Sequence, residues 1–184
     1  ANGDLLGQKT DAWEGGHRVP FIARWPSNIP EGSNCKRLLG LNDLMSTIAV
    51  AANIPLPAGA APDGLNQFPL LTDPVNAPAI RNEMIFLGTG GYALRQGKWV
   101  FLPKQGSCGM TVRVPPGPLW GQPYSAMGMT NSDVDETGKI KPDAPPSQLY
   151  NLRNDISQTT NRYADEPEKS RIMAKRLNEL LQKD

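Results

Sequence analysis

Two stretches of the chain place apolar residues with the period of an α-helix. Between residues 41 and 52, apolar side chains recur three and four positions apart, which is typical of a helix with one buried face. Asn42 is a favourable N-cap, and Asp43 stands in the first turn, where the helix dipole favours a carboxylate. Asn53 and Pro55 end the pattern. We expect this helix to pack through a stripe made of Leu41, Leu44, Met45, Ile48, Ala49 and Ala52.

The second helical stretch runs from about residue 167 to residue 182. Asp165 is its expected cap, and Glu166 and Glu168 occupy the first turn. Its apolar stripe consists of Met173, Leu177, Leu180 and Leu181.

Shorter apolar runs predict a small antiparallel sheet between these helices. Residues 84–87 form the first candidate strand, and residues 92–95 and 98–102 form a hairpin around Gln96-Gly97. We expect the final helix to cover one face of this sheet, which gives a small α+β subdomain.

Another apolar run, residues 19–25, lies between Gly and Pro residues and predicts a short buried strand. It follows a polar segment and a Glu14-Gly15-Gly16 corner. The two glycines let the backbone take positive φ or approach another segment closely.

Residues 103–147 show little periodicity and carry many prolines. Loops of this length within a domain are usually functional or disordered. Trp120, Tyr124, Met127 and Met129 argue against disorder in the middle of the segment. Near its end stand Asp133, Asp135 and Glu136, whose spacing fits no calcium loop and predicts a solvated acidic turn.

Composition narrows the classes of partner. The net charge is +1, and no basic patch is interleaved with aromatic residues, which argues against nucleic acid as a partner. No apolar run approaches the length that spans a membrane. Cys35 and Cys108 lack the spacing of a metal site, and they either pair in an exported protein or stay as buried thiols.

Lys9 is the candidate for chemistry. A lysine held just before a Gly-Gly corner is a fixed cation, which suits an oxyanion such as sulfate or phosphate. Taken alone, such a lysine is usually a solvated surface residue, and Glu14 and Arg18, four residues apart, can simply pair with each other.

The run Lys9-Thr10-Asp11-Ala12-Trp13-Glu14-Gly15-Gly16-His17-Arg18-Val19-Pro20-Phe21, continued by Arg24-Trp25-Pro26, resembles a segment of the type I, formylglycine-dependent sulfatases, the arylsulfatase A-like family. There a Lys precedes Glu-Gly-Gly-x-Arg-x-Pro and a strand ending in Trp-Pro. The resemblance implies that Lys9 is the active-site lysine that contacts the sulfate group. His17 is a second candidate for substrate binding, although a structural role beside Glu14 or Asp11 is the simpler interpretation.

The resemblance continues along the chain. Residues 41–71 resemble a family helix and its following loop, and residues 148–161 resemble the family's last strand and turn. The implied fold class is α/β: the C-terminal part of an alkaline phosphatase-like (sulfatase) fold with a small α+β subdomain, an antiparallel sheet plus a C-terminal helix. Residues 1–75 would end the large domain, and residues 80–184 would form the subdomain with its long loop 103–147. Residues 107–129 are the candidates for substrate selection at the cleft rim.

The family's nucleophile motif, Cys or Ser-x-Pro-Ala/Ser-Arg, does not occur in this sequence: Lys36 follows Cys35, and Gly109 follows Cys108. The resemblance implies that the intact enzyme uses Ca²⁺ bound by residues upstream, and that this chain holds no metal. Asn2-Gly3 predicts a turn rather than a calcium ligand.

The expected function is therefore the C-terminal part of a sulfatase that acts on aryl or carbohydrate sulfates, with the remainder of the sulfatase chain as its partner and no activity of its own. Two alternatives stay open: a stand-alone module that binds sulfated glycans, and a phosphate-ester hydrolase of the same superfamily. The family also implies a periplasmic or secreted location.

Overall fold

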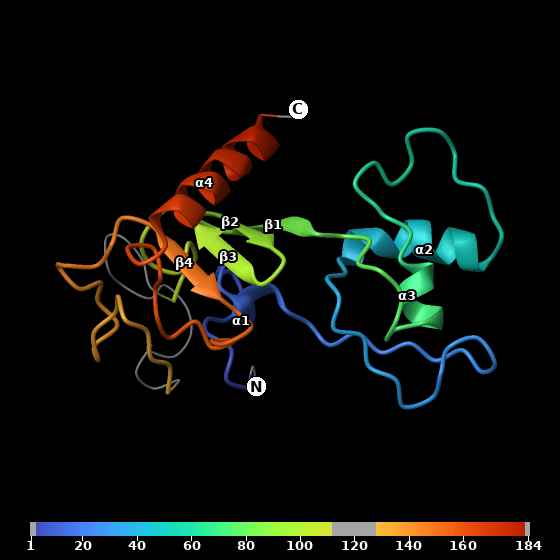
Figure 1. Ribbon diagram of the computed structural model, residues 1–184, viewed down its shortest axis with the longest axis horizontal. Helices are drawn as coiled ribbons and strands as arrows, with labels where there is room; N and C mark the ends of the chain where they lie inside the picture. The colour runs from blue at the N-terminus through green and yellow to red at the C-terminus, as the bar shows by residue number, and fades with distance from the viewer. Residues whose placement is uncertain (1–2, 112–127, 183–184) are drawn as a thin grey trace. The chain divides into compact units, whose positions relative to one another are not determined.

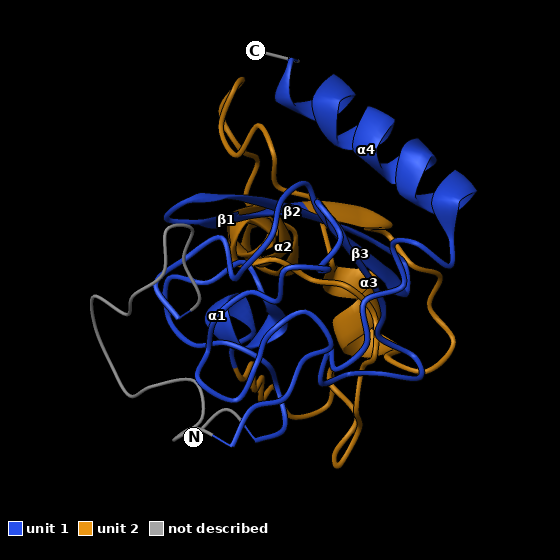
Figure 2. Cartoon of the chain, turned by 90° about the vertical axis from the view of Figure 1, so that its left-hand side faces the viewer, with its two compact units in different colours: residues 1–19, 85–184 blue, residues 20–84 orange. Residues whose placement is uncertain are grey.

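The computed structural model describes residues 3–111 and 128–182, and the chain divides into two compact units (Figure 2). Unit 1 combines Ala1–Val19 with Ile85–Asp184, and unit 2 comprises Pro20–Met84. The expected division into the end of a large domain and a subdomain concerns the whole protein and stays a prediction. Within this chain, the segment that carries Lys9 clusters with the C-terminal part. Of the candidates for substrate selection, residues 112–127 lie outside the described residues.

Unit 1 is built on a four-stranded sheet (Figure 1). Its strands lie in the order in which they occur in the chain: β1 (Glu83–Gly88), β2 (Gly91–Gln96), β3 (Trp99–Leu102) and β4 (Gln148–Asn151). β2 and β3 pair antiparallel around Gly97, whose φ is +57°. β3 and β4 also pair antiparallel. The predicted hairpin and last strand are confirmed.

The two faces of the sheet bury separate apolar clusters, because successive side chains of a strand point to opposite faces. One cluster joins Leu94, Phe101 and Leu149 to the C-terminal helix α4 (Pro167–Leu181). The other cluster joins alternate strand residues to the N-terminal segment, and it contains Leu6, Trp13, Val100, Leu102 and Tyr150.

Helix α4 covers one face of the sheet, as predicted (Figure 1). Met173 and Leu177 are buried, whereas Leu181 is 39% exposed. The expected cap, Asp165, is wrong by one residue: Glu166 is the N-cap, and the Asp165 carboxylate accepts a hydrogen bond from Arg162 at 3.0 Å instead.

Unit 2 contains the other predicted helix, which starts with the 3₁₀ turn η1 (Leu41–Asp43) and continues as α2 (Leu44–Ala51). A short helix, α3 (Phe68–Thr72), follows and was not predicted. Asn42 is not the cap: its side chain donates to the Asp63 carbonyl at 3.0 Å. Gly40 is the N-cap residue, and its N–H donates to the Asp43 carboxylate at 2.9 Å.

The buried side of η1 and α2 is largely polar. Asp43 and Thr47 are buried, as is Ala49, and Leu44 is half-buried, whereas most of the expected apolar stripe is exposed, with Leu41 at 62% and Ile48 at 62%. The prediction that the stripe packs therefore holds for Ala49 and is wrong for Leu41, Met45 and Ile48 in the described chain. The reason is that Asp43 accepts from the Leu65 N–H and from the Gln67 side chain, both at 2.9 Å, and so holds the 63–67 segment against the polar face.

Residues 19–25 are irregular and exposed, so the prediction of a buried strand is also wrong here. Ile22 is 90% exposed and Phe21 44%. A strand needs a neighbour that pairs its backbone and covers its side chains. The described residues pair no strand with this segment.

Cys35 is exposed and Cys108 is buried, and both are free thiols. In the described part of the long loop, a single bridge joins Val134 to Ile140. Asp133 is buried and accepts from Asn161 at 2.6 Å, so the prediction of a solvated acidic turn is wrong for this residue. Asp135 does hold a turn, since its carboxylate accepts from the Lys139 N–H at 2.9 Å.

Candidate functional site

Lys9 lies exposed on a turn in unit 1. The N–H of Asp11 closes the turn by donating to the Gln8 carbonyl at 3.0 Å. Gly7 and Thr10 flank Lys9 with φ of +87° and +88°. This conformation is open to glycine but costly for a β-branched residue such as threonine. The backbone around Lys9 is therefore held by contacts that outweigh this cost.

The Asp11 carboxylate provides several of those contacts, and its residue is only 1% exposed. Oδ2 accepts from the Gln8 N–H at 2.9 Å and from the Thr111 hydroxyl. Oδ1 accepts from the N–H groups of Met110 and Thr111 at 3.0 and 3.1 Å. One buried carboxylate thus joins the two ends of the Lys9 turn to a segment 100 residues further along.

Backbone hydrogen bonds fix the same turn to two segments of the chain. The Ala12 N–H donates to the Ser107 carbonyl at 2.8 Å, and the Thr89 N–H donates to the Thr10 carbonyl at 3.0 Å. Gly109 packs so closely that an added Cβ would clash with Asp11. The Lys9 turn is therefore part of the folded body of unit 1.

The Gly-Gly corner brings α1 (Glu14–His17) against this turn. The Gly15 N–H donates to the Leu6 carbonyl at 2.7 Å. A Cβ at Gly15 would clash with the Gly7 carbonyl, and one at Gly16 would clash with the Asp11 carbonyl. Of the two reasons that the sequence offers for these glycines, close approach of the backbone is the one that applies.

No hydrogen bond or ion pair engages the Lys9 ammonium within residues 3–111 and 128–182. The two carboxylates that follow Lys9 in the motif are occupied elsewhere, Asp11 by backbone and hydroxyl donors and Glu14 by arginines. An exposed ammonium without a carboxylate partner, carried by a turn whose backbone is fixed, can bind an oxyanion such as a sulfate or phosphate ester.

Glu14 is fully buried in α1. Burial raises the pKa of its carboxyl, and the charges of Arg95 and Arg18, each 3.4 Å from Oε2, act in the opposite direction. Its N–H donates to the Gln158 side chain at 2.8 Å. Glu14 therefore ties α1 to β2 and to the turn after β4.

His17 lies beside Glu14, with Nε2 4.0 Å from Oε1, and its ring stacks on Phe86 with the centroids 3.7 Å apart. Burial lowers the pKa of His17 to about 4, although a hydrogen bond to the Ala12 backbone favours the charged form, and Arg95 and Arg18 lower the pKa further. The imidazole is thus neutral at pH 7. This position suits the structural role that the sequence suggested beside Glu14.

Within the described residues, no group of three or more His, Cys, Asp or Glu side chains is arranged to hold a metal ion. None of its described helices is both long and apolar enough to cross a membrane.

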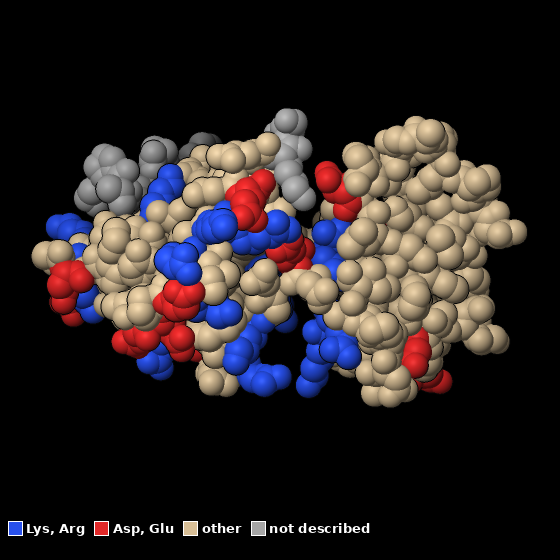
Figure 3. Space-filling model, turned by 45° about the horizontal axis from the view of Figure 1, so that its top comes forward, with Lys and Arg blue, Asp and Glu red and all other residues tan. Residues whose placement is uncertain are grey.

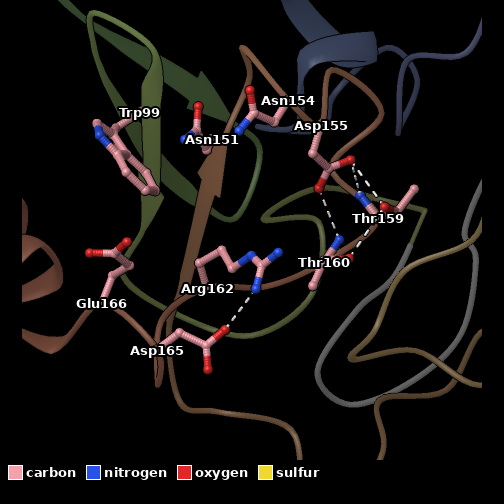
Figure 4. A pocket seen from close by; sticks show the side chains of 9 residues that line it. All are labelled: Trp99, Asn151, Asn154, Asp155, Thr159, Thr160, Arg162, Asp165 and Glu166. Atoms are coloured by element: carbon pink, nitrogen blue, oxygen red, sulfur yellow. Dashed lines mark hydrogen bonds and ion pairs between the residues drawn. The ribbon is translucent and has the colours of Figure 1, made fainter.

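A polar hollow of about 370 Å³ lies beside the turns that follow β4 (Figure 4). Arg162 donates to the neighbouring Asp165 carboxylate at 3.0 Å, and the Asp155 carboxylate accepts from the N–H groups of Thr159 and Thr160 at 2.9 and 3.0 Å. Because these charged groups are engaged within the turns, we assign the hollow no function. It is lined by Trp99, Asn151, Asn154, Asp155, Thr159, Thr160, Arg162, Asp165 and Glu166.

Sequence reasoning missed the supporting residues Asp11, Arg95 and Gln158. Asp11 stands within the motif, but its partners Met110 and Thr111 are distant in sequence. Gln158 is also distant in sequence from Glu14, whose N–H donates to it. Its φ of +51° marks it as a constrained position in the structure.

Comparison with known proteins points to one group of enzymes. No family model matches the chain. Arylsulfatase G of Canis lupus familiaris is 28% identical over 155 residues, which cover 82% of this chain and 25% of that protein. Steryl-sulfatase of Homo sapiens is 41% identical over 71 residues, covering 39% of this chain and 12% of that protein. The chain thus spans about a quarter or less of these relatives.

A solved structure shows the same fold. It is the structure of a protein described with the metabolism of multiple glycosaminoglycans by Bacteroides thetaiotaomicron. The two structures superpose with a TM-score of 0.66 at 23% sequence identity. The match covers 97% of this chain and 32% of that one. In sequence and in fold, the chain is related to a portion of the sulfatases, which confirms the expected fold class and the family resemblance.

Proposed function

We propose that this chain, a relative of the sulfatases in sequence and in fold, is the C-terminal portion of an enzyme that hydrolyses sulfate monoesters, in which Lys9 binds a sulfate oxygen of the substrate. The observation that carries the proposal is the exposed Lys9 ammonium, which lies on a turn fixed to two other segments and has no ion pair among the described residues. The sequence identity with arylsulfatase G and steryl-sulfatase supports the proposal.

The chemistry assigned to this chain is binding and charge stabilisation. A preorganised ammonium stabilises negative charge that develops on the sulfuryl group and the leaving oxygen. Because the turn is already fixed, little reorganisation is needed when the substrate binds. We assign the formylglycine nucleophile and Ca²⁺ to the portion of the enzyme that precedes this chain, and we derive no step from them.

The proposed substrate is a sulfated small molecule or glycan. The glycosaminoglycan metabolism of the structural neighbour supports a glycan. We assign His17 to the support of α1, because its ring stacks on Phe86 and its Nε2 lies beside the buried Glu14. A periplasmic or secreted location is proposed from the family alone.

The proposed partner of unit 2 is the remainder of the sulfatase chain. On the face drawn in Figure 3, unit 2 carries few charged side chains. Large apolar side chains that lie exposed on a soluble protein can be covered at an interface with another segment. We propose that the preceding portion covers the exposed apolar side chains of unit 2, which include Phe21, Ile22, Trp25, Leu41, Met45, Ile48, Val50 and Val75.

The test is the turnover of a sulfate ester by the complete protein. Lys9→Ala should lower kcat/KM about 100-fold, equivalent to about 3 kcal/mol of transition-state stabilisation. Lys175→Ala is the matched control, because Lys175 is an exposed lysine of the same unit, 74% exposed on α4. Turnover by Lys9→Ala at the rate of the control would overturn the assignment.

The same assays separate the alternative functions. Faster turnover of a phosphate ester than of the matching sulfate ester would favour a phosphate-ester hydrolase. Binding of sulfated saccharides by the isolated chain, lost in Lys9→Ala and kept in Lys175→Ala, with no hydrolysis by the complete protein, would favour a binding module.

A further inference from the structure

The hydrogen bonds of Asp11 have a role beyond folding. We propose that Asp11 is a positioning residue, which holds Lys9 in place for the sulfate ester through its bonds to Gln8 and to the 107–111 segment. This inference rests on the proposed function of Lys9. It adds a buried carboxylate that orients the cation without touching the substrate.

The first support is the strain of the turn itself. Thr10, directly after Lys9, has a φ of +88°, and its hydroxyl oxygen is buried without a hydrogen-bond partner in the described structure. A β-branched residue with an unpaired hydroxyl does not favour this conformation by itself. The conformation must therefore be imposed by the neighbouring contacts, and those of Asp11 are the most direct.

The second support is how the carboxylate is used. Asp11 accepts hydrogen bonds from Gln8 on the N-terminal side of Lys9 and from Met110 and Thr111 across the fold. A carboxylate can accept all of these bonds, whereas an amide has only one oxygen. In Asp11→Asn, an NH₂ group would replace one of the two carboxylate oxygens, and it would face donors that now bond to that oxygen. The turn would lose one of its two attachments while the side chain keeps its size.

The third support is the close packing of the backbone around the Asp11 carboxylate. An added Cβ at Gly109 would clash with the Asp11 carboxylate, and one at Gly7 would approach Oδ2 to 3.1 Å. The two glycines allow the backbone to close around this carboxylate. Lys9, by contrast, is exposed, and its ammonium has no hydrogen bond or ion pair within the described residues.

A double-mutant cycle in the complete protein tests the proposal. Lys9→Ala, Asp11→Asn and the double variant are compared for kcat/KM on a sulfate ester. Asp11→Asn should lower kcat/KM at least 10-fold when Lys9 is present and less than 2-fold when Lys9 is already alanine, because residues that act through one another are not additive. An equal loss in both backgrounds, or no loss with Lys9 present, would overturn the proposal.

Two further variants separate positioning from folding. Asp43→Asn is the matched control: Asp43 is also a buried carboxylate with several donors, but it lies in unit 2 and has no bond to the Lys9 turn. It should change stability without a Lys9-dependent loss of turnover. If Asp11→Asn does not fold, Thr111→Val takes its place in the cycle, since it removes the hydroxyl donor to Asp11 and keeps the shape.

Amide hydrogen exchange distinguishes failure of this inference from failure of the proposed function. Asp11→Asn should speed exchange of the Gln8 N–H, which donates to Asp11 at 2.9 Å. If Lys9→Ala turns over normally, the proposed function fails, and the role of Asp11 in that reaction fails with it. If Lys9→Ala is impaired while Asp11→Asn leaves both Gln8 exchange and turnover unchanged, only the positioning role of Asp11 is overturned.

Discussion

The imidazole of His17 lies flat on the ring of Phe86, with the centroids 3.7 Å apart and the planes 9° apart. Phe86 belongs to β1, so this stack fixes the end of α1 against the sheet. The same stack removes the imidazole from water, which is why the pKa of His17 falls to about 4.

This burial predicts a pH dependence of stability. The folded pKa of His17 lies below the unfolded value of 6.5, so its contribution is complete above about pH 6.5 and is lost as the pH falls toward 4. The full effect is on the order of 3 kcal/mol, and it should appear as a falling free energy of unfolding in urea titrations. Glu14, Arg18 and Arg95 are the charged groups that surround the ring.

The variant His17→Gln measures how much the histidine contributes to this pH dependence of stability. The raised pKa of Glu14 contributes with the opposite sign, because folding then favours its protonated form as the pH falls. Glu14 is present in both proteins, so the difference between their pH profiles reports His17 together with its effect on the Glu14 carboxylate 4.0 Å away. Identical slopes between pH 6.5 and 4 would contradict the prediction.

The Asp43–Arg81 pair should govern the stability of unit 2. Burial alone would raise the pKa of Asp43, but hydrogen bonds from Arg81, Gly40, Leu65 and Gln67 lower it to about 2. Its contribution is complete above pH 3.8 and is lost as the pH falls toward 2. Arg81→Met leaves a buried carboxylate without its cation and should cost about 3 kcal/mol in urea unfolding.

The control for Arg81→Met is Arg171→Met. Arg171 also pairs with a carboxylate, Glu168, at 2.7 Å, but both side chains are 69% exposed. Solvent screens such a pair, so no measurable change is expected. Equal destabilisation by the two variants would refute the special role of the buried pair.

Helix α4 should be essential for the stability of unit 1. Leu177 is 1% exposed and packs in the cluster with Phe101 and Leu149. Leu177→Ala should cost about 3 kcal/mol by chemical denaturation, because the cavity it leaves is enclosed. Truncation after Glu166 exposes the whole cluster and should give insoluble protein. Soluble, cooperatively folding truncated material would contradict this, and Lys175→Ala serves as the silent control.

The apolar surface of unit 2 predicts opposite effects in two settings. Ile22 is 90% exposed, so Ile22→Asp should leave the isolated chain folded and make it more soluble. In the complete protein, the same change should lower the yield of folded enzyme, because a charge would be buried at the proposed interface. Ile172→Asp, at a 42% exposed position on α4, is the control. Unchanged yield with Ile22→Asp would argue against burial of this residue.

The two thiols should differ in reactivity. Burial raises the pKa of Cys108 to about 11, and Lys104 only partly opposes this effect, so little reactive thiolate forms at pH 8. Cys35 is exposed. A thiol reagent should therefore modify one cysteine quickly in the native chain and the second only after denaturation. Rapid reaction of both in the native protein would contradict the buried position of Cys108.

Much of unit 1 could be predicted from the sequence. The first three strands, the turn at Gly97 and helix α4 follow from local apolar periods and turn residues, and the last strand follows from the family resemblance. The structure has all of them within a few residues of their predicted bounds. Local patterns succeed here because both faces of the sheet are covered by residues of the described chain: Leu94 and Phe101 by α4, and Val100 and Tyr150 by the N-terminal segment.

Residues 19–25 and the stripe of α2 show where the same reasoning failed. Their apolar character was read correctly, but burial depends on a neighbour, and the described chain covers neither Ile22 nor Ile48. The sequence also did not reveal that Asp43 would turn inward, because its partner Arg81 lies 38 residues away.

The sequence by itself determined the family resemblance, the candidate lysine and the order of strands and helices, since each of these is written in contiguous residues. Only the tertiary structure decided what holds Lys9 in place. Asp11 finds Met110 and Thr111 across about 100 residues of chain, and Glu14 finds Arg95 and Gln158. Such pairings depend on how the chain closes on itself, and no local pattern encodes that closure.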